Sequence, residues 1–150
     1  MIKHQGGCHC GQIRFTTEYD PLLVGQCNCT RCRRLYGTMS VGAMFGENEL
    51  EVSGETYEYT FNGGSGMPVH LHSCSTCGTR IYAEPEAFGG MVYVLLGSFD
   101  NSLEFEPKGE IFTKYKMRWL RDNGCIQESF EEAAVLERMQ ALMENLDQRG

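Results

Sequence analysis

The stretch Cys8-His9-Cys10-Gly11 and its later counterpart Cys74-Ser75-Thr76-Cys77-Gly78 decide which fold this chain is expected to adopt. In a strand, residues i and i+2 point to the same face, so Cys8 and Cys10 would present two sulfurs side by side, suited to one tetrahedral ion. The second stretch predicts a tight turn, because a glycine after Cys77 can adopt positive φ and let both thiolates converge. Together the two stretches predict one closed site of four thiolates that holds structural zinc.

Three further cysteines stand close together in Cys27-Asn28-Cys29-Thr30-Arg31-Cys32, which we expect to form a loop. Structural zinc has four protein ligands, whereas catalytic zinc keeps three and leaves a position for water or substrate. We therefore favour an open, catalytic zinc site at Cys27, Cys29 and Cys32, with the more labile of the two ions. Two alternatives stay open. Cys125 or a histidine completes a second structural site, or Cys29-x-x-Cys32 is a redox pair.

Composition and charge suit one globular domain over residues 1–150. Apolar residues make up 41%, and 13 basic against 20 acidic residues give a formal net charge of −7, so we expect no nucleic-acid partner. The chain shows no apolar signal segment and no apolar run long enough to span a membrane, which favours a cytoplasmic protein without a membrane partner. In that reducing compartment, eight cysteines favour metal ligation over disulfides.

Short alternating runs of apolar and polar residues, separated by glycine and proline, predict a mostly β fold. Ile13 and Phe15 should face one way in a strand over residues 12–17, and the aromatic side chains of residues 56–61 should cover one face of a half-buried strand. Further strands are predicted at residues 38–45, 49–53, 69–72, 79–83, 111–113 and 91–96, the last of them buried on both faces. These strands suffice for two packed sheets.

A helix is predicted near the end of the chain, from about residue 129 to about residue 147. Ser129-Phe130-Glu131-Glu132 has the form of a capping box, and its acids favour the positive end of the helix dipole. The apolar residues that follow fall on one stripe of such an amphipathic helix: Val135, Met139, Leu142, Met143 and Leu146. We expect the stripe to be core or dimer contact, with a partner-binding face as the alternative, and the oligomeric state stays open.

Three segments, Gly7–Phe15, Cys27–Arg34 and His72–Thr79, carry the seven clustered cysteines. Their pattern and order resemble the three motifs of the glutathione-dependent formaldehyde-activating enzyme (GFA) family, also called the CENP-V/GFA domain family. A weaker later signature is similar from residue 96 onward, so the resemblance covers about residues 6 to 120. One position departs from the family. Where many members have a histidine before Ile111, this chain has Glu110.

The resemblance implies a mostly β fold of stacked small antiparallel sheets, a β-tent or zinc-ribbon-like sandwich that carries two zinc ions. It implies that structural zinc is bound by Cys8, Cys10, Cys74 and Cys77, and catalytic zinc by Cys27, Cys29 and Cys32. It also implies a carbon–sulfur lyase that condenses formaldehyde with glutathione to S-hydroxymethylglutathione. The division of the cysteines agrees with the ligand counts above.

A zinc ion held by three thiolates carries a formal charge of −1 and suits sulfur chemistry. A small thiol, glutathione or a relative, would lose its proton at the open position and attack a small carbonyl compound. In the alternative mode the ion holds water or polarises the carbonyl. Arg31, Arg33 and Arg34 are the candidate contacts for an anionic substrate, with solvated charges or backbone anchors as the alternative.

The expected function is therefore a zinc-dependent carbon–sulfur lyase that acts on a small thiol and a small carbonyl compound. The competing function is a non-catalytic zinc module that binds another protein. No histidine is assigned as general acid or base. His9 should face away from its neighbouring zinc, and His70 and His72 should share one strand face.

Overall fold

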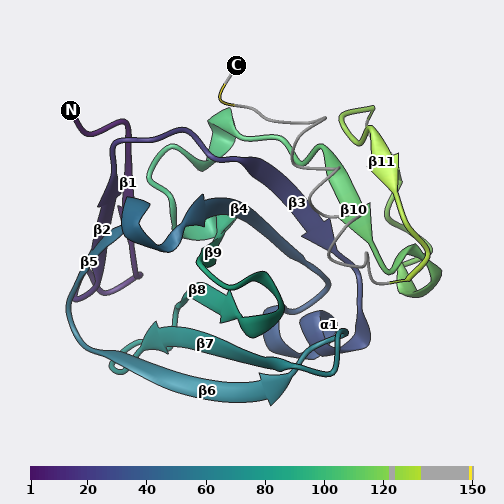
Figure 1. The fold of residues 1–150 in the computed structure, drawn as a ribbon, viewed down its shortest axis with the longest axis horizontal. Coiled ribbons are helices and arrows are strands. Elements are labelled where there is room, and N and C mark those ends of the chain that lie inside the picture. The colour runs from purple at the N-terminus through teal and green to yellow at the C-terminus, as the bar shows by residue number, and fades with distance from the viewer. Residues whose placement is uncertain (122–123, 133–148, 150) are drawn as a thin grey trace.

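Two β-sheets make up most of the structure, a computed structural model that describes residues 1–121, 124–132 and 149 (Figure 1). The smaller sheet contains, in spatial order, β1 (His4–Gly7), β2 (Arg14–Thr17) and β5 (Glu51–Ser53). The larger sheet contains, in spatial order, β11 (Glu128–Ser129), β10 (Gly109–Ile111), β3 (Leu23–Cys27), β4 (Ser40–Gly46), β9 (Met91–Leu95), β8 (Arg80–Pro85), β7 (Pro68–Cys74) and β6 (Thr56–Asn62). One α-helix, α1 (Thr30–Tyr36), lies among the described residues.

The prediction of a mostly β fold is confirmed, and every predicted strand overlaps an observed one. The prediction of small antiparallel sheets is wrong for the larger sheet, in which β10 pairs in parallel with both β3 and β11. Antiparallel neighbours need only a short turn between them, whereas parallel neighbours need a long crossover. Glu110 of β10 pairs with Gln26 of β3, 84 positions earlier, so no local pattern could show this pairing.

The aromatic strand β6 is more exposed than its alternating pattern predicts. Tyr57 is 62% exposed and Tyr59 is 48% exposed. The reason is position in the sheet, because β6 is an outermost strand and pairs only with β7. Alternation fixes which side chains share a face, but it does not say whether another layer covers that face.

The main core joins the two sheets. Ile13 and Phe15 are buried, as predicted, and they pack with Phe45 of β4 and Val94 of β9. Burying each of these side chains stabilises the fold by about 1.5–3 kcal/mol. The sheets approach closely at Gly6 of β1, where a Cβ atom would collide with the backbone beyond β9, so this position needs glycine.

The apolar run at β9 has buried neighbours on both of its faces, as predicted. Val92 and Val94 point into the main core. Tyr93 points the other way, and its ring lies so close to Gly42 of β4 that a Cβ there would be 2.5 Å from the ring. The second face of β9 therefore belongs to a different part of the molecule from the main core.

The predicted helix start at Ser129 needs correction. Glu128 and Ser129 form β11, and the Ser129 hydroxyl donates to Glu110 Oε1 at 3.0 Å instead of capping a helix. The backbone N–H of Phe130 donates to the Glu110 carbonyl oxygen at 3.0 Å, which continues the parallel pairing. Residues 133–148, which carry the predicted apolar stripe, lie outside the described residues.

The larger sheet curls over, so that β3 and β4 lie on one side and β7 and β6 on the other, with α1 beside the end of β3 (Figure 1). Side chains of α1 and of the distant strands β3, β7 and β8 line one cavity. Within the described part of the chain, no helix is long and apolar enough to cross a membrane.

Candidate metal centres

Four cysteine sulfurs from two distant parts of the chain meet beside the smaller sheet. The Sγ atoms of Cys8, Cys10, Cys74 and Cys77 all lie within 4.8 Å of one another. The Cys8–Cys10 distance is 3.5 Å and the Cys10–Cys74 distance is 3.7 Å. A tetrahedral zinc ion with Zn–S bonds of about 2.3 Å places its sulfurs about 3.8 Å apart, whereas a disulfide needs about 2.05 Å. The four-cysteine cluster therefore has the spacing of a zinc site.

The first half of this cluster is a hairpin turn and not a strand, which corrects the expected local structure. β1 ends at Gly7, and the N–H of Gly11 donates to the Cys8 carbonyl oxygen at 3.2 Å. Gly11 adopts φ 84°, which glycine tolerates without a side-chain clash. The tight turn between β1 and β2, rather than strand alternation, turns both sulfurs to one side.

The second half forms the turn that the sequence predicts. Cys74 is the last residue of β7, and the N–H of Gly78 donates to its carbonyl oxygen at 3.0 Å. Gly78 adopts φ 78°. The N–H groups of Thr76 and Cys77 donate to Cys74 Sγ at 3.4 and 3.5 Å, as amides do around a metal-bound thiolate.

Charge is unevenly distributed over this cluster. Hydrogen bonds from Thr79 lower the pKa of Cys77 to about 5. A hydrogen bond from the backbone N–H of Gln12 favours a lower pKa of Cys10, but the neighbouring Cys8, desolvation and the other two sulfurs raise this pKa to about 11. A metal ion must therefore displace protons from part of the cluster when it binds. His9 is exposed and lies outside the cluster.

The remaining three clustered cysteines lie where β3 passes into α1. Cys27 ends β3, Cys29 is the residue that caps α1, and Cys32 lies in the first turn of that helix. The expected six-residue loop is thus a strand end joined to a helix start. Their sulfurs lie within 4.8 Å of one another, and among the described residues no histidine, aspartate, glutamate or further cysteine joins them. Cys125 belongs to neither cluster.

Hydrogen bonds fix the sulfurs of this three-cysteine cluster. The N–H of Cys32 donates to Cys29 Sγ at 3.2 Å, and the Ser40 hydroxyl donates to Cys32 Sγ at 3.4 Å. Hydrogen bonds from the other two cysteines lower the pKa of Cys29, and the same contacts raise the pKa of Cys27. The Tyr93 hydroxyl donates a hydrogen bond to Ser40 Oγ at 3.2 Å and so helps to position the Ser40 hydroxyl.

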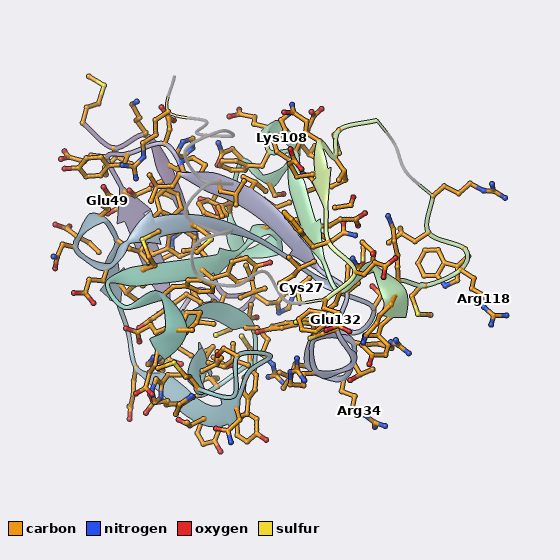
Figure 2. The ribbon with its side chains drawn as sticks, turned by 45° about the vertical axis from the view of Figure 1, so that its right-hand side comes forward. Cys27, Arg34, Glu49, Lys108, Arg118 and Glu132 are labelled. Atoms are coloured by element: carbon orange, nitrogen blue, oxygen red, sulfur yellow. The ribbon has the colours of Figure 1, made fainter. Side chains whose placement is uncertain are left out.

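A cavity of about 190 Å³ opens beside the three-cysteine cluster, whose side chains form part of its wall. The rest of the wall comes from the larger sheet, from α1 and from segments that connect the strands, and it includes Leu23, Met44, Val69, Ala83, Phe88 and Tyr93. Figure 2 shows Cys27 near the middle of the molecule, below β3. The three-cysteine cluster thus borders the cavity.

The three arginines of α1 occupy different environments. Arg31 lines the cavity, and its guanidinium lies 5.4 Å from the centre of the Phe112 ring. Arg33 donates to the Tyr115 carbonyl oxygen at 2.9 Å, so it anchors backbone. Arg34 is exposed and points away from the body of the protein (Figure 2). Arg31 is therefore the arginine placed to meet a ligand in the cavity.

The Phe112 backbone is strained. It adopts φ 55°, a left-handed conformation that a bulky residue rarely takes. This conformation directs the ring against Arg31 and also against Gly64, where a Cβ atom would lie 2.6 Å from the ring. The strained backbone thus occurs where the Phe112 ring packs against Arg31, a residue of the cavity wall.

Glu110 is a buried acid whose environment the sequence did not reveal. It is 5% exposed, and the Lys116 ammonium lies 3.1 Å from its Oε2. The Asn28 side-chain amide donates to the same oxygen at 3.2 Å. Asn28 stands between two cluster cysteines, so this network ties the cysteine segment to β10. The sequence singled out residue 110 because many family members have a histidine there. The contact with Asn28, however, depends on the parallel pairing of β3 with β10, which the sequence did not show.

Tyr36 is a second cavity residue that sequence reasoning missed. It ends α1 and lines the cavity. Burial raises its pKa, and repulsion from the thiolates of Cys32, Cys27 and Cys29 adds to the effect. Its hydroxyl is therefore protonated at neutral pH. The sequence predicts a loop here and not helix α1. In a helix, Tyr36 lies about one turn beyond Cys32 and therefore on the same side.

The histidines of β7 lie outside this site. His70 and His72 share one strand face, as expected, and neither lines the cavity. His72 Nε2 lies 2.6 Å from Glu84 Oε1, and His70 Nδ1 lies 3.1 Å from Glu58 Oε1. These histidines pair with acids on neighbouring strands.

Comparison with known proteins adds a family and a fold. A family model described as glutathione-dependent formaldehyde-activating enzyme matches residues 3–115, which include both cysteine clusters. The chain is also similar to a Rhodobacter sphaeroides protein whose crystal structure was determined as a Northeast Structural Genomics target. The two are 17% identical over 84% of this chain and 98% of that one, with a TM-score of 0.50. At this identity the likeness concerns the fold alone.

Proposed function

The chain belongs to the glutathione-dependent formaldehyde-activating enzyme family, and we propose that it is a zinc-dependent carbon–sulfur lyase joining a small thiol to a small carbonyl compound. One observation carries the proposal. Three sulfurs, from Cys27, Cys29 and Cys32, share a site in a cavity wall, and the described residues offer no fourth ligand of the kinds zinc prefers. A closed structural site would not leave such a vacancy in its ligand set.

Both clusters fit zinc by donor chemistry, because thiolates in groups of three or four are ligands that this ion accepts. Cys8, Cys10, Cys74 and Cys77 would hold a structural ion that fastens the β1–β2 hairpin to the end of β7. Cys27, Cys29 and Cys32 would hold the second ion. When bound there, zinc supplies a positive centre that lowers the pKa of an incoming thiol.

The proposed reaction needs no oxidant or reductant. The thiol sulfur forms a bond to the carbonyl carbon, and the electron pair of the C=O π bond moves to oxygen. The proton that leaves the thiol ends on that oxygen, so the product is a hydroxyalkyl thioether. With glutathione and formaldehyde, the substrates in the family's name, the product is S-hydroxymethylglutathione.

Two side chains of the cavity have chemistry that suits these substrates. Arg31 would bind a carboxylate of the thiol through charge-assisted hydrogen bonds. The protonated Tyr36 hydroxyl would donate a hydrogen bond to the carbonyl oxygen, where negative charge develops during addition. The apolar wall limits access of water, which would otherwise compete with the thiol for the carbonyl carbon.

The test is to measure exchange between formaldehyde, glutathione and their adduct by NMR on the zinc-loaded protein. We expect the wild type and Cys125→Ala to accelerate exchange and Cys29→Ala to lose the acceleration. Tyr36→Phe should lower kcat about a hundredfold if its hydroxyl stabilises the developing charge. If the wild type accelerates exchange for neither glutathione nor any other small thiol, the non-catalytic zinc module becomes the better description.

A further inference from the structure

We infer that the carbonyl substrate carries an apolar body, a small aromatic ring or a branched aliphatic chain, which fills the cavity beside Cys27, Cys29 and Cys32. This inference rests on the proposed function, because it names a substrate class for the same site. It goes beyond the family's name, since formaldehyde has no such body.

The cavity wall is apolar on several sides. Leu23 and Met44 form one buried cluster with the rings of Phe88 and Tyr93 around it. Ala83 and Val69 come from the opposite side of the curled sheet. An apolar surface of this kind gains free energy when a ligand displaces water from it.

Most polar groups of the wall are already engaged within the protein. Apart from the cysteines, Arg31 and Glu110 are the ionisable side chains of opposite charge that line it within the described residues. The Glu110 carboxylate already accepts from Asn28 and from Lys116. The Ser40 hydroxyl donates to Cys32 Sγ. Arg31 is thus the polar anchor left for the thiol, and the remaining wall favours an apolar partner.

The cavity size sets the size of that partner. An apolar cavity of about 150 Å³ holds a benzene molecule. The volume of about 190 Å³ therefore accommodates one aromatic ring or a branched chain of similar size. A one-carbon aldehyde would leave most of the apolar wall in contact with water or with empty space.

Binding of an unreactive apolar probe tests the inference without turnover. We would titrate para-fluorobenzyl alcohol into the zinc-loaded protein and follow the fluorine NMR signal. Ala87→Phe adds a ring to the cavity wall, at a half-buried position between β8 and β9. Leu103→Phe is the matched control, because that side chain is fully exposed and is not part of the cavity wall.

We expect the wild type and Leu103→Phe to bind the probe, and Ala87→Phe to bind it at least about tenfold more weakly, since each buried methylene is worth about fourfold in affinity. Zinc content should be equal in all three proteins. With the same thiol in both reactions, Ala87→Phe should lower kcat/KM for isovaleraldehyde about tenfold or more relative to kcat/KM for formaldehyde. The difference in intrinsic reactivity of the two aldehydes cancels in this comparison.

The outcomes separate this inference from the proposed function. If the probe binds in the cavity while no aldehyde reacts with any thiol, the proposed function fails and the apolar ligand class stands. If the thiol reaction proceeds but Ala87→Phe affects formaldehyde and isovaleraldehyde equally, or the probe binds Ala87→Phe as well as wild type, the inference is overturned.

Discussion

The Sγ atoms of Cys10 and Cys74 lie 3.7 Å apart, although 64 positions separate them in the chain. This contact joins the β1–β2 hairpin of the smaller sheet to the end of β7 in the larger sheet. Closing so long a loop costs chain entropy, which metal binding in the folded state would offset. We therefore expect the four-cysteine cluster to act as a folding element.

Cys74→Ser should remove this element. Because it deletes one of four ligands, we expect the protein to lose one zinc ion and more than about 4 kcal/mol of its free energy of unfolding. Zinc analysis and chemical denaturation measure the two effects. Cys125→Ser, which makes the same replacement outside both clusters, should retain both ions. Equal zinc content and stability in Cys74→Ser and wild type would show that the cluster is no metal site.

Lys116→Ala should destabilise the fold by about 3 kcal/mol, because it leaves the buried Glu110 carboxylate without its cation. Lys114→Ala is the matched control. Its partner Glu132 is exposed, so the loss should stay below about 1 kcal/mol. Urea denaturation of both variants gives the comparison, and equal losses would show that burial of Glu110 carries no energetic weight.

Local sequence patterns were sufficient for most of the strands and for the grouping of the cysteines. Ile13 and Phe15 alternate as core residues do, and they are buried. The turn at Gly78 follows from the glycine after Cys77. Each of these features depends on neighbours within a few residues, which is the range over which alternation and turn chemistry act.

Features that depend on distant contacts could not be predicted. Helix α1 is seven residues long and carries no buried residue, so its sequence lacks the apolar stripe from which a helix is predicted. Ser129 lies in a strand because it pairs with β10, although its own neighbours favour a helix cap. The cavity arises from the curl of the larger sheet, and its wall gathers residues from Leu23 to Phe112.

Arg31→Ala should raise KM for glutathione about tenfold, the effect of losing a charge-assisted hydrogen bond to a carboxylate. KM for 2-mercaptoethanol, which has no carboxylate, should not change. Arg34→Ala alters the exposed arginine of the same helix and should leave both KM values at the wild-type level. Steady-state kinetics with each of the two thiols measures these KM values. A rise with both thiols would mean that Arg31 only supports the fold.

The ion pair between Arg14 and Asp100 should make a small contribution to stability that depends on pH. The hydrogen bond from Arg14 lowers the pKa of Asp100 below 3.8, so the pair stabilises the fold above that value and ceases to do so as pH falls through the folded pKa. Both side chains are nearly half exposed, so Asp100→Asn should cost less than about 1 kcal/mol. Thermal unfolding from neutral to acid pH should show this difference shrinking. A difference that grows toward acid pH would contradict the assignment.

The central claim is that the three-cysteine cluster holds an ion with room for a substrate thiol. Its most direct measurement is the ultraviolet–visible absorption spectrum of the cobalt-substituted protein during titration with glutathione and with benzyl mercaptan. In wild type we predict that the sulfur-to-cobalt absorption grows with added thiol and saturates. In Cys29→Ala, the four-cysteine site should keep its own absorption, and added thiol should not increase it. A wild-type spectrum that neither thiol changes at millimolar concentration would contradict the claim.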